Sequence, residues 1–417
     1  MRLTASLAIG AALLLPGSIE VANAQSAAER QKIELQFRAW QVRDLWPEAK
    51  RRGIRRTTFD RAFQGVNLLW KLPDLHPPGS KTKVPKARWE SEFRAPGRYF
   101  REARINRLVS LGRAELNRWG GTLDRIEKKY GVSKRIIVAI WAQETGYGRA
   151  KLPYNAVAAL ATQAFMGRKK KFFRTELLAG LRILQEGHIG YSRFRSSWAG
   201  ALGNPQFLPS KFLEYAVDFD GDGRRDIWDS VPDSLASIGH FLKSHGWHAN
   251  RDWGFESVVP ASVSCALEGP DKGYPIQRWV DSGVRRVSGR PFPASERKRT
   301  GFLMMPAGRY GPAFIATKNF YTLKEYNESD VYALFIGHLA DRFASNKPLV
   351  GRWKALDGFT RLEVHRMQNR MIRKGYDVGG ADGLVGFKTR RSIGAWQEKA
   401  GRAATCFPDK ELVRAIR

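Results

Sequence analysis

The chain has 417 residues, with 71 Lys and Arg against 40 Asp and Glu, so its formal net charge is +31. With 43% hydrophobic and 12% aromatic residues it can bury a full core, which excludes wholesale disorder, and its length predicts two or more domains. The charge excess attracts polyanions, a class that includes nucleic acid, anionic membrane surfaces and acidic cell-wall polymers. Charge alone does not choose among them.

The N-terminus has the pattern of a secretory signal peptide. Arg2 precedes an apolar run from Leu7 to Leu15, and Ala22-Asn23-Ala24 is a small-x-small cleavage site. We expect residues 1–24 to be removed and the protein to be exported to the periplasm, soluble or wall-associated; an ordinary apolar N-terminal helix is the alternative. No stretch reaches the roughly 20 apolar residues of a transmembrane helix, and no Cys after the cleavage site indicates a lipid anchor. Export argues against nucleic acid as the partner.

Helical periodicity dominates the next part of the chain. It runs from residue 30 to about 70 and resumes from about Arg101 to Gly246. Between residues 250 and 320, short apolar runs separated by Gly and Pro predict short strands or irregular structure. A helix from Ser329 to Phe343 then closes the large unit. The expected buried positions of the first segment are Phe37, Trp40, Leu45, Phe59 and Phe63.

The C-terminal part reads as a separate small domain. Residues 346–356 are expected to be a linker, and residues 357–417 a domain of three helices around a glycine-rich segment. The helical stripes are Leu362, Val364, Met367 and Met371, then Ile393, Trp396 and Ala400, then Leu412 and Ile416.

Two cysteines occur, Cys265 and Cys406. An oxidising compartment permits a disulfide between them, but two unpaired buried thiols fit the sequence equally well. So low a count excludes a disulfide scaffold and a Cys-based metal site.

One carboxylate lies in line with an apolar helix face. In the helix expected within residues 133–149, Glu144 follows Ile137, Ile140 and Trp141 at helical spacing. Burial would favour the neutral acid and raise the pKa of Glu144, as a general acid for glycoside cleavage requires. The spacing alone favours a simpler interpretation, a Glu at a helix end that pairs with Arg149 or another base.

Residues 218–229 match the EF-hand calcium loop. Gly223 stands at position 6, where the backbone turns, and Arg224 at position 7 would offer only its carbonyl. Hard oxygen ligands at this spacing predict a structural Ca²⁺, with no organic cofactor. The alternative is a solvated Asp/Gly turn that pairs with basic neighbours. Acidic residues occupy positions 1, 3, 5, 9 and 12, namely Asp218, Asp220, Asp222, Asp226 and Asp229, the last in place of the usual Glu.

Several segments together resemble a known family. Residues 140–149 read IWAQETGYGR and residues 197–210 read SWAGALGNPQFLPS. With the Asp218 loop, His245-Gly246-Trp247, Asn319-Phe320-Tyr321 and Tyr326-Asn327, they resemble the family B lytic murein transglycosylases, here without a lipid anchor. The resemblance covers most of residues 30–343. It implies a mainly α (α+β) fold, with a lysozyme-like helical catalytic domain over residues 25–345 that carries a small β-containing insertion.

The resemblance also implies a reaction. In that family one glutamate is the catalytic acid and base, so Glu144 would protonate the glycosidic oxygen between N-acetylmuramic acid and N-acetylglucosamine of peptidoglycan. It would then accept the proton of the muramoyl C6 hydroxyl, which attacks internally and leaves a 1,6-anhydromuramoyl end. The matching positions imply substrate-binding roles for Ser197, Gln206, Tyr326 and Asn327, and Tyr147 is a candidate to stack on a sugar. A helix cap at Ser197 and a core role for Tyr326 are the simpler alternatives.

The C-terminal residues 357–417 resemble the small peptidoglycan-binding domain of wall enzymes. Phe387 replaces a Pro that is usual there. The resemblance implies wall binding, and a module that only stabilises the catalytic domain is the alternative. The segments that carry it are Gln368, Gly375-Tyr376-Asp377-Val378, Ala381-Asp382-Gly383 and Gly386-Phe387-Lys388-Thr389.

A lytic transglycosylase is therefore the leading hypothesis. The competing ones are a hydrolytic muramidase and a non-catalytic wall-binding protein. A desolvated Glu144 favours an enzyme, because an inert protein has no need of one.

Overall fold

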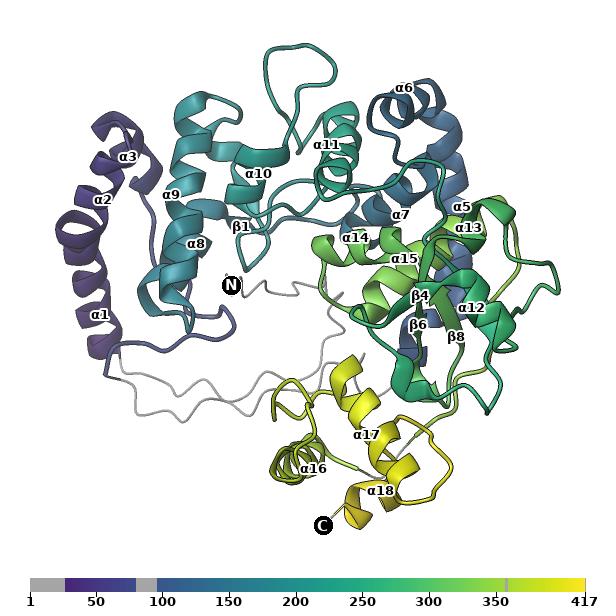
Figure 1. Cartoon of the computed structure of the whole chain (residues 1–417). Helices are drawn as coiled ribbons and strands as arrows, with labels where there is room; N and C mark the ends of the chain where they lie inside the picture. The colour runs from purple at the N-terminus through teal and green to yellow at the C-terminus, as the bar shows by residue number, and fades with distance from the viewer. Residues whose placement is uncertain (1–26, 80–95, 357–358, 417) are drawn as a thin grey trace.

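The computed structural model describes residues 27–79, 96–356 and 359–416, so the expected leader, residues 1–24, lies outside the described residues. Helices fill the part of the chain before the sheet, one five-stranded sheet follows, and three helices form the C-terminal end (Figure 1). This is the mainly α, α+β architecture that the sequence predicts.

The expected helical segments before residue 246 are present, and all five predicted apolar side chains of the first one pack into the core, Trp40 only partly buried. Two short strands, β1 (Tyr154–Asn155) and β2 (Arg195–Ser196), pair antiparallel among them. The helices are α1 (Ala27–Trp40), a π-helix (Gln41–Leu45), α2 (Trp46–Arg51), α3 (Arg56–Phe63), a 3-10 helix (Pro96–Phe100), α5 (Glu102–Arg118), α6 (Gly120–Tyr130), α7 (Lys134–Thr145), α8 (Ala156–Met166), α9 (Lys170–Glu186), a 3-10 helix (Tyr191–Arg193), α10 (Pro209–Tyr215) and α11 (Val231–Ser244).

The central helix α7 is buried on all sides. Every residue from Ile136 to Thr145 is buried, as expected for a helix that is apolar all round. Helices α5, α6, α11 and α15 pack around it. Gly146 ends α7 with a φ of 59°, a left-handed conformation that glycine adopts without steric cost.

The strands expected between residues 250 and 320 form an antiparallel sheet in the order β4-β6-β8-β3-β5. Its register pairs Phe255 with Ile315 and Leu303 with Ile315, and these side chains build a core of their own with Trp279. The elements are β3 (Gly254–Val258), η4 (Cys265–Leu267), β4 (Gly273–Pro275), α12 (Ile276–Asp281), β5 (Arg285–Arg286), α13 (Ala294–Arg297), β6 (Thr300–Met304), β7 (Pro306–Arg309) and β8 (Ala313–Ala316).

Two helices return the chain from the sheet to the helical core. They are α14 (Lys318–Tyr326) and α15 (Asp330–Ala344), and α15 packs against both α7 and α5. The predicted helix from Ser329 to Phe343 is thus α15, with Ser329 as its N-cap: the Ser329 hydroxyl accepts a 3.1 Å hydrogen bond from the amide of Tyr332.

The expected linker lies against the large unit. The amides of Val350 and Gly351 donate to the carboxylate of Glu256, and the Trp353 ring stacks on Phe100 with 5.1 Å between the ring centroids. Beyond it, residues 359–416, here called the C-terminal unit, form the three expected helices α16 (Arg361–Arg373), α17 (Phe387–Lys399) and α18 (Lys410–Ala415) around their own apolar core.

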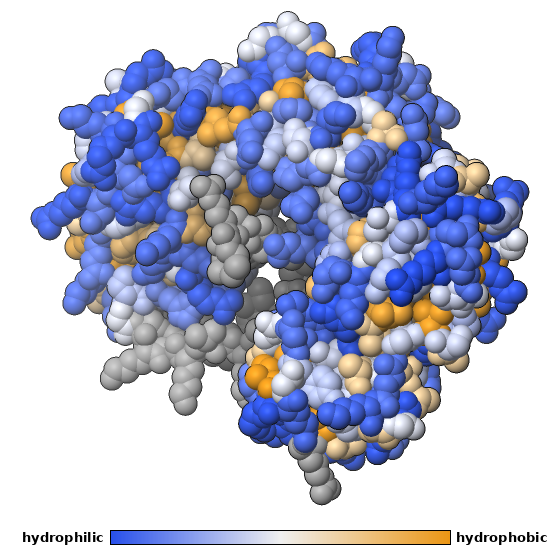
Figure 2. Space-filling model, viewed as in Figure 1, coloured by the Kyte–Doolittle hydropathy of each residue, from blue (hydrophilic) through white to orange (hydrophobic). Residues whose placement is uncertain are grey.

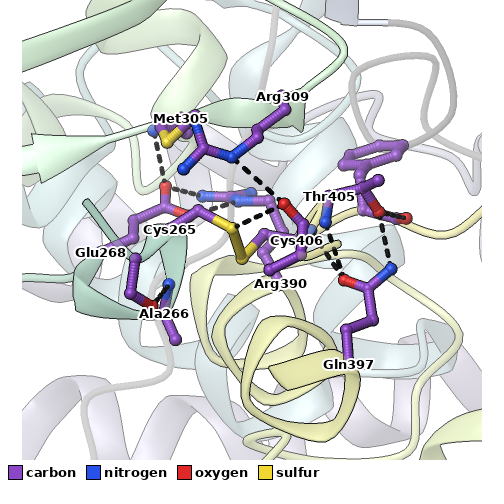
Figure 3. Close-up of a disulfide and its surroundings, with 12 residues drawn as sticks. Cys265, Ala266, Glu268, Met305, Arg309, Arg390, Gln397, Thr405 and Cys406 are labelled. Carbon is purple, nitrogen blue, oxygen red and sulfur yellow. Dashed lines mark hydrogen bonds and ion pairs between the residues drawn. A yellow bond between two sulfur atoms is a disulfide. The ribbon is translucent and has the colours of Figure 1, made fainter. Parts of the chain in front are cut away.

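Cys265 and Cys406 form a disulfide, which settles the choice that the sequence leaves open (Figure 3). The bond joins η4, beside the sheet, to the loop between α17 and α18. Gly394 of α17 faces the bond, and a Cβ at this position would lie 2.2 Å from the Cys406 sulfur. The disulfide therefore fixes the C-terminal unit covalently to η4 in the large unit.

The surface agrees with the composition. The face drawn in Figure 2 is mostly hydrophilic, with apolar residues in scattered patches. Within the described ranges, no helix has the length and apolar character to cross a membrane.

The disulfide yields a stability prediction. Because it closes a loop with a sequence separation of 141 residues, the double variant Cys265→Ser/Cys406→Ser should lose about 3–5 kcal/mol of unfolding free energy. Urea denaturation of the oxidised wild type, the reduced wild type and the variant measures this. Equal midpoints for all three would contradict a stabilising role.

Candidate active site

Glu144 lies in the last turn of α7, and helix α15, which comes much later in the chain, packs against α7 there. Its side chain is 6% exposed. Helix α15 brings Tyr332, which is 1% exposed, against it. The Tyr332 hydroxyl donates a 2.5 Å hydrogen bond to Oε1 of Glu144.

The simpler interpretation of Glu144, an ion pair with Arg149, is not what the structure has. Arg149 instead pairs with Glu115 of α5, at 3.2 Å between Nη2 and Oε1. Among the described residues, no basic group contacts the Glu144 carboxylate.

The electrostatics of the site favour a protonated Glu144. Burial raises the pKa of Glu144 to about 8, and the hydrogen bond from Tyr332 opposes that rise. Burial, followed by the Glu144 charge, also raises the pKa of Tyr326 and of Tyr332, so both phenols stay neutral donors. A carboxyl group with such a pKa keeps its proton at neutral pH, the state in which it can act as a general acid.

The loop that carries two predicted binding residues is held by local hydrogen bonds. The Ser197 hydroxyl accepts from the Ala201 amide at 3.1 Å. Gln206 has a φ of 55°, a left-handed conformation rare outside glycine, and its Nε2 donates to the Gly203 carbonyl at 2.9 Å. Strained backbone of this kind concentrates at functional sites, so Gln206 stays a candidate.

Asn204, which the sequence analysis did not select, joins this loop to α7. Its Oδ1 accepts from the indole nitrogen of Trp141 at 3.0 Å, and its Nδ2 donates to the Trp228 carbonyl and the Ser234 hydroxyl. Gly148 must lack a side chain here, because a Cβ would lie 2.7 Å from Asn204 Oδ1. A polar residue in a glycine-rich segment has the pattern of an ordinary turn former, so no local pattern predicts this role for Asn204.

Tyr326 and Asn327 stand at the end of α14. The Tyr326 hydroxyl donates a 2.6 Å hydrogen bond to the carbonyl of Pro205, next to Gln206. Asn327 is buried and accepts from the Ser329 amide at 3.1 Å through its side-chain oxygen. Tyr326 thus links the Gln206 loop to the surroundings of Glu144, while the Asn327 side chain supports the start of α15.

Tyr147 belongs to the core. It is 5% exposed, its hydroxyl donates to the carbonyl of Leu108 in α5, and its ring meets Trp141 edge-on. This packing favours a structural role for Tyr147 over the sugar stacking that the sequence analysis considered.

The loop of residues 218–229 brings together three of the five carboxylates that the sequence predicts as ligands. Asp218, Asp220 and Asp222 offer oxygens that all lie within 4.8 Å of one another, and all three residues are exposed. Arg224 turns its guanidinium onto Asp222, with a shortest distance of 2.8 Å. The donor set at positions 1, 3 and 5 suits a hard cation such as Ca²⁺.

The other two carboxylates have different partners. Oδ1 of the buried Asp226 accepts the amides of Trp228 and Asp229, and the Asp229 carboxylate pairs with Arg193. Both therefore lie outside the cluster of three carboxylates in this structure, and their role as ligands stays a prediction.

A further carboxylate, Asp233 at the start of α11, was missed because it follows the motif. It is fully buried, and it accepts the amides of Phe219, Asp220 and Asp226. Asp233 thereby fixes the backbone of the loop of residues 218–229 at three points.

The family model described as "Transglycosylase SLT domain" matches residues 36–341. The chain belongs to this family. Its helical core accordingly has the lysozyme-like fold of the lytic transglycosylases, as the sequence resemblance implies.

Three relatives illustrate the match. Membrane-bound lytic murein transglycosylase B of Escherichia coli is 26% identical over 333 residues, 77% of this chain and 82% of that protein. The crystal structure of SltB3 from Pseudomonas aeruginosa in complex with NAG-anhNAM-pentapeptide is 35% identical, with a TM-score of 0.80 over 91% of this chain and 99% of its own. Escherichia coli Slt35 in complex with calcium is 26% identical, with a TM-score of 0.51 over 61% of this chain and 78% of its own.

The Tyr332 contact makes a prediction about pH dependence. Tyr332→Phe removes a hydrogen bond that stabilises the charged carboxylate, so the pKa of Glu144 should rise above about 8. Since a general acid works only when protonated, the alkaline limb of the kcat/KM profile should move to higher pH. Tyr310→Phe, which loses a hydroxyl bonded to Asp409 in the C-terminal unit, is the control. An alkaline limb unchanged in Tyr332→Phe would contradict the contact.

Proposed function

We propose that the chain is a lytic transglycosylase of peptidoglycan that cleaves the β-1,4 bond between N-acetylmuramic acid and N-acetylglucosamine and leaves 1,6-anhydromuramoyl ends. The observation that carries the proposal is the buried Glu144, with its pKa near 8, at the centre of a domain of this family. The anhydro sugar bound to the relative SltB3 supports the same product.

In the proposed mechanism Glu144 acts first as the acid and then as the base. Tyr332 engages Oε1 of Glu144, which leaves Oε2 to carry the proton. Glu144 gives that proton to the glycosidic oxygen, and the bond from this oxygen to the muramoyl C1 breaks. The resulting Glu144 carboxylate then takes the proton of the muramoyl C6 hydroxyl. As this proton leaves, the C6 oxygen forms the new bond to C1. Glu144 ends protonated, so it is ready for another turnover, and no water is consumed.

The surroundings of Glu144 support this route over hydrolysis. Glycosidases usually need a second carboxylate, either as a nucleophile or to activate water. In the described ranges, no second carboxylate contacts Glu144 or shifts its pKa. An internal hydroxyl needs no such partner, because it arrives with the substrate.

Digestion of purified peptidoglycan tests the reaction and the residue together. Wild-type protein should release muropeptides lighter by one water than hydrolysis products. Glu144→Gln should lower the rate by at least about a hundredfold, whereas the surface variant Glu411→Gln should not. Fully hydrated reducing ends would show a hydrolytic muramidase, and wall binding without lysis by the wild type would show a non-catalytic protein.

A calcium ion in the loop of residues 218–229 is part of the proposal. Three carboxylates within 4.8 Å of one another repel in the absence of a cation, and the relative Slt35 is in complex with calcium. Asp218, Asp220 and Asp222 would hold the ion, and its contribution would be to brace the loop.

Calcium binding should appear as thermal stabilisation. Ca²⁺ at a hundredfold excess over its Kd should add about 2.7 kcal/mol to the unfolding free energy, and chelation should reverse this. Asp220→Asn should reduce the shift, while Asp281→Asn, a carboxylate bonded only to Gln277 in the described contacts, should keep it. Identical melting curves with calcium and with chelator would contradict calcium binding by this loop.

Export and wall binding complete the proposal. The leader of residues 1–24 supports a periplasmic location, and the resemblance of residues 357–417 supports a wall-binding domain after a linker at residues 346–356. The net charge of +31 suits the anionic wall, whose lactyl and peptide carboxylates such a surface attracts.

A further inference from the structure

A buried network of four charges joins the C-terminal unit to the large unit. Arg390 of α17 donates to both oxygens of Glu268, at 2.9 and 2.7 Å, and to Oδ2 of Asp330 at 2.9 Å. Lys324 of α14 donates to Oδ1 of Asp330 at 2.5 Å. Two basic and two acidic groups thus balance one another. Figure 3 shows Arg390 and Glu268 beside the disulfide.

The network is enclosed and geometrically fixed. The side chains of Arg390 and Glu268 are 3% and 1% exposed, and that of Asp330 is 17% exposed. Burial alone would raise the pKa of Asp330, but Lys324 and Arg390 hold it well below its usual range. The bidentate contact of the Arg390 guanidinium with Glu268 fixes the orientation of the guanidinium as well as pairing its charge. Asp330 is therefore an anion held from two sides.

Asp330 is the first residue of α15, two residues before Tyr332. Ser329, the preceding residue, accepts the Tyr332 amide at the helix cap, and the Tyr332 hydroxyl contacts Glu144. On the other side, Lys324 lies two residues before Tyr326, whose hydroxyl binds the Pro205 carbonyl. The last turn of α14 and the first residue of α15 therefore both contribute to the charge network.

We infer that Arg390 is a positioning residue for the reaction: through Asp330 it fixes the start of α15, and with it the Tyr332 hydroxyl on Glu144. The inference rests on the proposed catalytic role of Glu144. The C-terminal unit thus completes the active site from outside, whether or not it also binds the wall.

A second ion pair across the same interface separates this role from simple docking. Arg391, the next residue of α17, binds Asp271 at 2.7 Å. That contact also joins the C-terminal unit to the large unit, but it does not touch α14 or α15. The disulfide and the Arg390–Glu268 pair likewise hold the two units together without Asp330. Among the described ion pairs between the two units, the Arg390–Asp330 pair is the one that involves a residue of α15.

The site gives a readout specific to positioning. Tyr332 from α15 and Tyr326 from α14 are the described titratable groups coupled electrostatically to Glu144; from α5, Arg104 binds the adjacent Gln143 instead. If the start of α15 shifts, the Tyr332 bond to Glu144 weakens. The alkaline limb should then move to higher pH, in the same direction as for Tyr332→Phe.

The first variant is Asp330→Asn, which keeps the size of the side chain and the Arg390–Glu268 pair but weakens the ion pairs of Asp330 with both Arg390 and Lys324. On a soluble uncross-linked glycan we expect kcat to fall about tenfold to a hundredfold, KM to stay within about twofold, and the alkaline limb to rise. Arg390→Lys keeps the positive charge but loses the planar guanidinium that binds Glu268 and Asp330 together. It should change these quantities in the same direction. Arg391→Gln is the matched control and should leave all three quantities unchanged.

A double-mutant cycle measures the energetic coupling between Asp330 and Tyr332. Because both changes act on one hydrogen bond, Asp330→Asn/Tyr332→Phe should be little slower than Tyr332→Phe alone. Additive effects would overturn the inference, as would a folded Asp330→Asn protein with wild-type kcat and pH profile. Failure of Asp330→Asn to fold would also count against it, since the contact would then serve folding. If the wild type forms no anhydro ends, or Glu144→Gln keeps full activity, the proposed function itself fails, and the two failures are thereby distinguished.

Discussion

The removal of Glu144 from water raises its pKa, and this burial depends on helices from several parts of the fold. Ten consecutive residues of α7 are buried, which requires helices on every side of it. One of these, α15, comes from the far end of the large unit and also supplies the phenol that orients the acid. Desolvation and orientation thus come from the same helix contact, and neither is available from α7 alone.

Two loops are fixed by buried polar side chains that bind neighbouring segments. Asn204 ties the Gln206 loop to α7 and to the carbonyl of Trp228, while Asp233 holds three amides of the calcium loop. Asn204 therefore connects α7, which carries Glu144, to the loop of residues 218–229. The Asp233 carboxylate is satisfied by backbone amides, and the Asn204 amide by a backbone carbonyl and two side chains, which limits the cost of burying them.

The parts predictable from sequence are those written in local patterns. Helical spacing predicted the helical core and α15, and the Gly and Pro clusters predicted the short strands. Glu144 stood out because a charge interrupted an apolar face. Tyr332 did not, because it lies in the run Val331 to Ile336 and reads as a core aromatic. Asn204 and Asp233 were missed for a related reason, since their partners are groups that folding brings near from other segments. In the same way, the spacing of residues 218–229 does not show that Asp229 meets Arg193.

The disulfide has a topological consequence for the charge network. Residues 265 to 406 form a covalently closed loop, and this loop contains α14, α15 and the segment of residues 346–356. A protease that cut this connecting segment once would therefore not release the C-terminal helices. The nicked protein would remain a single molecule, with Arg390 still beside Asp330, until a reductant opened the bond.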